Sequence, residues 1–186
     1  MPPRPVVKFP HSIFVGTDVC RIARVRRILE TAEKREPFVR RVLGRGEEER
    51  ARIDPILGRL AEEEKRKGEG EGVSCLAVAV ASLLRLARRP SPAASSPERL
   101  QLLDQAAVHM AGRFAAKEAI IKAHPHLPKL SFDQIRIRAG PDGAPAAVVT
   151  PDGREPQQAR LSISHDGDYA TAVCLGFEHI PGEGEE

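Results

Sequence analysis

Apolar and polar residues in the first third of the chain follow a strand pattern and then helical patterns. The β-rich run at 11–17 predicts a strand. From 19 to 30 apolar residues recur every three or four positions, which predicts a helix. A short helix is expected at 37–43 and a charged helix at 47–67. Between the first predicted strand and the first predicted helix is Asp18, at the end of the strand.

A long helical stretch over 97–124 opens the second half of the chain and stops at Pro125. The segments after it are separated by turn signals and have strand-like composition and alternation. Strands are therefore expected at 129–138, 146–150, 159–165 and 169–177. Helices followed by antiparallel strands indicate an α+β fold.

The chain has 186 residues, which suits one domain. Glycine- and glutamate-rich sequence and then proline- and serine-rich sequence bound the segment at about 68–97, whose apolar middle is expected to be helical. We interpret 68–97 as an insertion in a single domain over 11–178. Residues 1–10 are expected to be a flexible arm rather than a targeting presequence, because the prolines at positions 2, 3 and 5 disfavour an amphipathic helix. Residues 179–186 are expected to form an acidic tail.

The composition excludes several classes of protein. The three cysteines form no Cys-x-x-Cys pair, which disfavours a disulfide framework or a thiolate zinc site and suits a reducing compartment. No apolar run approaches the ~18 residues of a membrane span. Tryptophan is absent and aromatic residues make up only 4%, so a stacking platform for single-stranded nucleic acid is not expected.

Two carboxylates are candidates for chemistry. Asp18 fits either a cap for the following helix or a ligand for a hard cation at the end of a strand. Glu118 shares the apolar face of the long helix with Phe114 and Ile121, where a carboxylate is costly unless it is paired or binds a metal. Lys122, four residues on, can pair with it. Two carboxylates with a lysine suggest a Mg²⁺ site for a phosphorylated substrate.

The hexapeptide Ser-Ile-Ser-His-Asp-Gly at 162–167 is a third candidate. Within a strand Ser164 lies on one face and His165 on the other. His165 followed by Asp166 fits either an acid–base or phosphate-binding pair or polar turn chemistry. The chain has no Gly-x-Ser-x-Gly elbow, Walker loop or kinase glycine-rich loop, which disfavours a hydrolase or an ordinary nucleotide kinase.

Three stretches of the sequence resemble the holo-acyl-carrier-protein synthases, which are 4′-phosphopantetheinyl transferases of the small, single-domain type. They are Val-Gly-Thr-Asp-Val-Cys-Arg-Ile-Ala-Arg at 15–24, Gly-Arg-Phe-Ala-Ala-Lys-Glu-Ala-Ile-Ile-Lys at 112–122 and Leu-Ser-Ile-Ser-His at 161–165. The three blocks stand in the family's order. The resemblance implies a phosphopantetheinyl-transferase-like α+β fold, with a long helix packed on a small antiparallel sheet.

The resemblance also implies an activity. The family transfers the 4′-phosphopantetheine group of coenzyme A to a serine of an apo acyl carrier protein and releases adenosine 3′,5′-bisphosphate. Carried over, Asp18 and Glu118 would hold Mg²⁺. The residues that would line the coenzyme A site are Arg113, Lys117, Lys122, Ser164 and His165. The residues expected to act in catalysis are Glu118, Lys122, His165 and Asp166, with the general base open between a water at the metal, His165 oriented by Asp166, and Glu118 itself.

The partner implied by the resemblance is an acidic apo acyl carrier protein of fatty acid biosynthesis. Residues 21–45 contain nine basic residues against three acids, a far more basic balance than the +3 of the whole chain. Arg21 and Arg24 would dock the carrier. Family members are usually trimers, so a homotrimer is one expectation, and the compartment is expected to be mitochondrial or cytoplasmic.

A different class of function is also compatible with this basic region. The chain would then be a catalytically silent relative, or a basic scaffold that binds an acidic protein partner. Nucleic-acid binding is not expected, because the basic residues are not accompanied by any recognition motif. The complete set of Asp18, Glu118 and Lys122 favours the enzyme.

Overall fold

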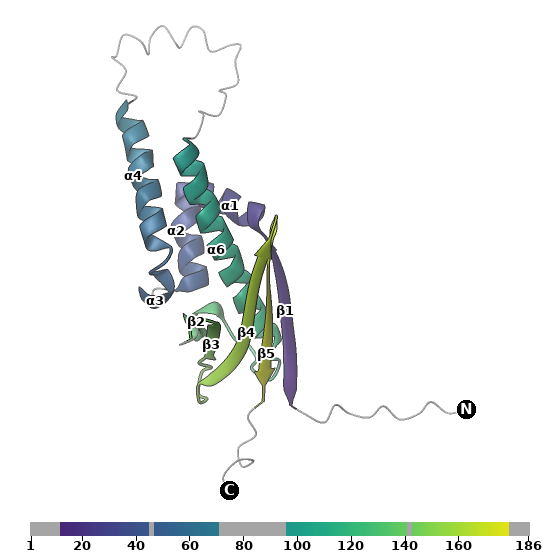
Figure 1. The fold of residues 1–186 in the computed structure, drawn as a ribbon. Helices are drawn as coiled ribbons and strands as arrows, with labels where there is room; N and C mark the ends of the chain where they lie inside the picture. Colours follow the sequence, from purple (N-terminus) through teal and green to yellow (C-terminus); the bar gives the residue numbers. More distant parts are fainter. Residues whose placement is uncertain (1–11, 45–46, 71–95, 141–142, 179–186) are drawn as a thin grey trace, which may run out of the picture.

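The computed structural model describes residues 12–44, 47–70, 96–140 and 143–178. They form a five-stranded antiparallel sheet with helices on one side, which confirms the predicted α+β class (Figure 1). The helices are α1 (Ile22–Glu30), α2 (Ala32–Leu43), α3 (Glu47–Arg50), α4 (Asp54–Gly70) and α6 (Pro97–Lys122). The strands are β1 (Ile13–Arg21), β2 (Ile135–Ala139), β3 (Pro145–Val149), β4 (Gln157–Asp166) and β5 (Tyr169–Phe177), and a 3-10 turn, η1 (Phe132–Gln134), precedes β2.

The long helix α6 is the centre of the fold. It lies along the sheet, and α1, α2 and α4 are grouped around its first half (Figure 1). It begins where the sequence predicts, because the Ser96 hydroxyl caps it by accepting a hydrogen bond from the Arg99 amide at 3.1 Å. Pro97 in the first turn suits this start. Its buried side is built largely from alanines, which lets neighbouring elements approach closely.

The first strand is longer than the sequence predicted. β1 pairs with β5 along its whole length, from Ile13 opposite Phe177 to Arg21 opposite Tyr169, and α1 begins only at Ile22. The helical reading of 19–21 was therefore wrong, because the hydrogen bonds to β5 outweigh local periodicity. Asp18 lies inside the strand rather than at its end, and it does not cap α1.

Other boundaries also differ from the prediction. The second helix starts at Ala32 rather than 37, and the charged segment is divided into α3 and α4, with Ile53 buried at the break. α4 continues to Gly70, so the start of the expected linker is helical. β2 is shorter than predicted because η1 takes the residues before it. The arm at 1–10, the tail at 179–186 and most of the insertion, including its expected helix, lie outside the described residues, and the domain limits stay predictions.

Two glycines bring the sheet against the backbone of α6. A Cβ atom on Gly16 would lie 1.9 Å from the carbonyl oxygen of Ala119, and one on Gly176 would lie 2.2 Å from that of Ala123. No larger residue fits at either position without displacing backbone. This contact fixes the middle of β1 beside the last turns of α6.

The opposite face of the sheet is covered by none of the described helices. Side chains that alternate with the buried ones along β1 and β5 are directed to this face, and several are large and apolar. The exposed apolar residues there are Ile13, Val15, Val19, Tyr169, Val173, Leu175 and Phe177. A contiguous apolar surface of this kind marks an interaction site in a soluble protein. We call it the free sheet face.

Candidate active site

Asp18 and Lys122 meet where β1 crosses the end of α6. The Lys122 amine lies 2.8 Å from Asp18 Oδ1 and 3.0 Å from the carbonyl oxygen of Thr17. Asp18 is directed at α6 because it shares a strand face with the buried Gly16 and Cys20. The sequence had offered Glu118 as the partner of Lys122, and the structure replaces it with Asp18, on a remote element.

Glu118 lies one helical turn before Lys122, on the same side of α6. It is half-buried, and it makes no hydrogen bond or ion pair with any described residue. Its carboxylate is thus available for a ligand, beside a second carboxylate that already attracts a cation. Asp18 and Glu118 supply the hard oxygen ligands that Mg²⁺ prefers, and the donor set fits that ion.

Within 12–44, 47–70, 96–140 and 143–178, no cluster of three or more Asp, Glu, His or Cys side chains could enclose a metal ion. A cation held by Asp18 and Glu118 would therefore keep most of its coordination positions for water and for substrate oxygens. That is the usual mode of Mg²⁺ at phosphate chemistry, where one or two carboxylates share the ion with phosphate oxygens.

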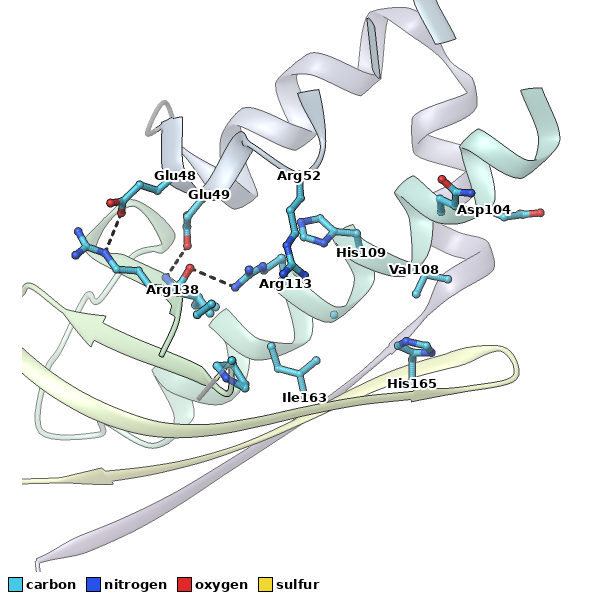
Figure 2. Close-up of a pocket in the computed structure, with 16 residues that line it drawn as sticks. Glu48, Glu49, Arg52, Asp104, Val108, His109, Arg113, Arg138, Ile163 and His165 are labelled. Atoms are coloured by element: carbon cyan, nitrogen blue, oxygen red, sulfur yellow. Dashed lines mark hydrogen bonds and ion pairs between the residues drawn. The ribbon is translucent and has the colours of Figure 1, made fainter. Parts of the chain in front are cut away.

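A second site is a pocket of about 880 Å³ on the other side of α6 (Figure 2). Its walls come from α3 and the turn after it, from α6, from β2 and the turn to β3, and from β4. Two predicted residues, Arg113 and His165, line it. Arg113 donates a hydrogen bond of 3.3 Å to the carbonyl oxygen of Ile137, and burial lowers the pKa of its guanidinium.

Sequence reasoning missed the three other arginine and histidine side chains of the pocket, namely Arg52, His109 and Arg138. His109 could have been identified from the sequence, because it lies one turn before Arg113 on the same helical face. The other two reach the pocket only through tertiary packing. Burial, reinforced by repulsion from Arg113 and Arg52, lowers the pKa of His109 to about 4.

Lys117 is turned into the protein instead of lining this pocket. It is 1% exposed, and its amine donates to Glu49 at 2.9 Å and to the carbonyl oxygen of Phe132 at 3.0 Å. Burial lowers the pKa of Lys117, and the charge of Glu49 opposes that shift. This differs from the expected role in the coenzyme site, since at least two of the three amine donors serve the fold.

The hexapeptide at 162–167 divides between the two faces of the sheet. His165 faces α6 and the pocket, while Ser164 and Asp166 lie on the opposite face, opposite Thr171 and Tyr169 of β5. The alternation of Ser164 and His165 is as predicted. The expected orientation of His165 by Asp166 is wrong for this structure, because adjacent strand residues point apart and no hydrogen bond joins them.

The predicted residues therefore form two groups within one chain. Lys122 is nine positions beyond Arg113, which is about two and a half turns, so their side chains leave α6 in opposite directions. The order of the strands separates the two groups in the same way. Asp18 lies on β1 and His165 on β4, and β5 lies between these two strands. A ligand that touches both groups within one copy would have to cross the helix.

The two docking candidates lie at and after the end of β1. Arg21 ends the strand, is exposed, and alternates with Cys20, so it is directed to the free sheet face. The Arg24 guanidinium lies 5.8 Å from the ring centre of Phe114, a cation–π distance, and Phe114 is one turn before Glu118. Arg35, counted with the basic region, is instead buried and bonded to Glu64. The described part of the chain contains no helix long and apolar enough to cross a membrane.

Comparison with known proteins agrees with the motifs and the fold. The sequence pattern of the 4′-phosphopantetheinyl transferase superfamily matches residues 84–174. The match covers just under half of the chain, and over that range the chain is similar to the superfamily. The matched range contains Glu118, Lys122 and His165, and Asp18 precedes it.

Two relatives show how far the similarity extends. It is 41% identical to the holo-[acyl-carrier-protein] synthase of Corynebacterium efficiens over 86 residues, which are 37% of this chain and 61% of that protein, so the match spans less than two thirds of the relative. It is 28% identical to the mitochondrial 4′-phosphopantetheinyl transferase B of Aspergillus fumigatus over 181 residues, 91% of this chain and 97% of that one.

A solved structure shares the fold of this chain. The acyl carrier protein synthase of Plasmodium yoelii with ADP bound superimposes with a TM-score of 0.50 at 24% identity. The superposition covers 89% of this chain and 94% of that one. It agrees with the predicted arrangement of a long helix on a small antiparallel sheet.

Proposed function

We propose that the protein transfers the 4′-phosphopantetheine group of coenzyme A to a serine of an apo acyl carrier protein and releases adenosine 3′,5′-bisphosphate. One observation carries the proposal: Asp18 and Lys122 are in contact, and the unpartnered carboxylate of Glu118 lies one turn away. These residues stand at the family's motif positions. The names of the relatives support the same activity.

The charges at this site suit an attack on phosphorus. Asp18 and Glu118 would hold Mg²⁺, which when bound supplies Lewis-acid stabilisation of phosphate charge. Lys122 is exposed enough to leave Asp18 and contact a phosphate oxygen, where it would stabilise the negative charge that develops during attack. Glu118 would also be the candidate to accept the serine proton, because His165 and Asp166 lie elsewhere in the same copy.

The second group of residues would bind the rest of the coenzyme. Arg113 and His165 offer cationic and hydrogen-bonding groups in a pocket large enough for part of a nucleotide. Because this pocket lies across α6 from Asp18, we propose that coenzyme A runs between the pocket of one copy and the carboxylates of the next. Ser164, on the free sheet face, would then also be near a neighbouring copy.

The assembly that we propose is a homotrimer. The free sheet face supports self-association, because its apolar side chains would otherwise lie in water. The division of the site between two sides of α6 supports an arrangement in which each copy completes the site of another.

The proposed partner is an acidic carrier protein, and the proposed location is mitochondrial. Arg24 contacts Phe114, one turn before Glu118, and Arg21 ends β1 three residues after Asp18, so an acidic surface bound to these arginines would bring its serine toward Glu118. The name of the Aspergillus relative supports the compartment, and the carrier there would serve fatty acid synthesis. The two described cysteines, Cys20 and Cys174, are unpaired, which suits a reducing environment.

The test is a mass assay with coenzyme A, Mg²⁺ and several apo carriers, including those of mitochondrial type. The expected result is a gain of one phosphopantetheine group per carrier, abolished by EDTA and by Asp18→Asn or Glu118→Gln. Asp152→Asn, in the turn before β4, is the matched control and should leave the reaction unchanged. No mass gain with any carrier would overturn the proposal. Unchanged partner binding and function in Glu118→Gln would favour a binding protein.

A further inference from the structure

His124 is buried where the long helix α6 ends against the sheet. Its side chain is 1% exposed, and its Nδ1 atom lies 2.7 Å from the carbonyl oxygen of Ile120, one turn earlier. A carbonyl oxygen only accepts hydrogen bonds, so the ring proton belongs on Nδ1 and His124 is the donor. Burial lowers the pKa of His124, although the bond to Ile120 opposes that shift, and the ring is neutral near pH 7.

This side-chain bond takes the place of a backbone bond of the helix. In a continuing α-helix the amide of His124 would donate to the carbonyl oxygen of Ile120. Here that amide donates to Ile121 instead, at 3.2 Å, and Ile120 keeps only a backbone bond of 3.1 Å from Ala123. The imidazole N–H thus supplies a bond that the backbone no longer makes, and it fixes the last turn of α6.

Two glycines hold the same turn from the side of the sheet. A Cβ atom on Gly16 of β1 would lie 2.6 Å from the amide nitrogen of Ala123. One on Gly176 of β5 would lie 2.9 Å from Cε1 of the His124 ring. The ring therefore packs closely between the end of the helix and β5, which restricts its orientation.

Lys122 leaves α6 from this turn. It lies midway between Ile120 and His124, the two residues that the side-chain bond joins. Its amine is 2.8 Å from Asp18 and 3.0 Å from the carbonyl oxygen of Thr17. The side chain is 52% exposed, so these two contacts and the backbone of the turn place the amine. A shift of the turn would move the amine away from Asp18.

The neighbouring His126 packs in the same place without a hydrogen bond to the helix. Its ring centre lies 5.6 Å from the ring centres of His124 and Phe14. Both of its nitrogen atoms are buried and have no hydrogen-bond partner in the described structure. The two histidines therefore allow the packing of an imidazole ring to be separated from the hydrogen bond of His124.

We propose that His124 is a positioning residue for Lys122. Its hydrogen bond to Ile120 fixes the last turn of α6, so that the lysine amine stays beside Asp18, where the transferring phosphate would lie. The inference rests on the proposed function, since it takes Lys122 as the residue that stabilises that phosphate. His124 is buried and acts only through the backbone of the turn.

The first test asks whether His124 acts through Lys122. His124→Phe keeps a ring and removes the donor, and it should lower kcat about 10-fold while the KM for coenzyme A changes less than about twofold. In the Lys122→Met background the same substitution should lower kcat less than about twofold, because the amine that it displaces is absent. His126→Phe is the matched control and should leave kcat unchanged. Equal losses from His124→Phe in the two backgrounds would overturn the positioning role.

Two polar variants test the hydrogen bond itself, and they keep the test valid if His124→Phe does not fold. Asparagine presents its amide N–H near the position of Nδ1, whereas glutamine presents it near the position of Nε2. His124→Asn should therefore keep kcat within about threefold of the wild type. His124→Gln should show the loss of about 10-fold expected for phenylalanine. The reverse order of the two variants would overturn the proposal.

Chemical labelling of lysines separates this inference from the transfer activity. Acetylation followed by peptide mass spectrometry measures the reactivity of each amine, with the exposed Lys65 as the internal reference. His124→Phe should raise the rate for Lys122 about 2- to 5-fold, the factor by which an exposed ion pair holds its amine, and His126→Phe should not. An unchanged rate in His124→Phe would overturn the positioning role. If no carrier were modified but Lys122 still responded to His124→Phe alone, the proposed transfer would fail and the positioning role would stand.

Discussion

The ammonium group of Lys117 and the carboxylate of Glu49 form a buried ion pair at 2.9 Å, with exposures of 1% and 7%. The other oxygen of Glu49 accepts a hydrogen bond of 2.7 Å from the Ile137 amide on the sheet-edge strand β2. A single carboxylate thus joins α3, α6 and β2. The same three elements form walls of the pocket. The Lys117–Glu49 pair therefore fixes the positions of these walls relative to one another.

Replacing Glu49 by glutamine should therefore destabilise the protein. The variant leaves the Lys117 charge buried without a counter-ion, and we expect a loss of about 2–4 kcal/mol in the free energy of unfolding, measured by denaturant titration. Glu48→Gln is the matched control, because its exposed pair with Arg138 should contribute less than about 1 kcal/mol. Equal effects of the two variants would contradict the structural role of Glu49.

Gly16→Ala should be severely destabilising. The new Cβ would overlap the backbone of α6 at Ala119, so β1 and the helix would have to separate. We expect at least about 3 kcal/mol of lost stability, or no folded protein. Gly58→Ala in α4 makes the same chemical change in open space, and it should stabilise by about 0.5–1 kcal/mol. Thermal unfolding of both variants tests this, and a folded, stable Gly16→Ala protein would show that the contact is not as tight as described.

Lys122→Met should lower the transfer rate without unfolding the protein. The side chain is 52% exposed, so its contact with Asp18 contributes little to stability. The loss of a charge that stabilises the transferring phosphate should reduce kcat about 100-fold, measured by carrier mass shift over time. Lys65→Met, on the exposed surface of α4, should be silent. A normal rate in Lys122→Met would remove the lysine from the proposed site.

Glu64→Gln should destabilise the protein in a pH-dependent way. Two hydrogen bonds from Arg35, at 2.7 and 3.2 Å, hold the pKa of Glu64 below its usual 4.5. The stabilisation is thus present above pH 4.5 and is lost as the pH falls through the lower folded-state pKa. We expect a cost of about 1–3 kcal/mol at pH 7, because Arg35 is left buried, and a shrinking difference in acid.

Denaturant titrations of wild type and Glu64→Gln across this pH range check the prediction. Glu62→Gln, an exposed neighbour on α4 with no described partner, should show little effect at any pH. A difference between wild type and Glu64→Gln that does not change with pH would point to packing rather than charge.

Val173→Glu should break the assembly of the protein. A carboxylate in the middle of the free sheet face would be buried without a partner if copies pack there. Light scattering after size exclusion should show a trimer for the wild type and a smaller species for the variant. Leu100→Glu, at an exposed apolar position of α6, should leave the mass unchanged. A wild type that stays monomeric at all concentrations would overturn the proposed trimer.

Part of the candidate site could be predicted from the sequence, because it depends on local backbone geometry. Glu118 and Lys122 are four residues apart, and any α-helix places such residues on one side. The alternation of Ser164 and His165 followed equally from strand geometry. The roles proposed for them come from the resemblance of their motifs to the family, since the spacing alone fits an ordinary surface pair.

The missed features all depend on partners remote in sequence. Asp18 was expected at the end of a strand, but β5, some 150 residues later, extends β1 past it, and the carboxylate is directed toward Lys122. Lys117 looked like a site residue of a motif, and only the packing of α3 shows that Glu49 neutralises it inside the protein. Arg52 had no distinguishing pattern at all.

The amino-acid sequence by itself determined the α+β class, the long helix and the family that the chain resembles, because periodicity and short motifs are local properties of a backbone. Tertiary structure alone decided the length of β1, the free sheet face and the division of the site between two sides of α6. The reason is physical: hydrogen bonds and burial between distant segments outweigh local preferences of a few tenths of a kcal/mol per residue.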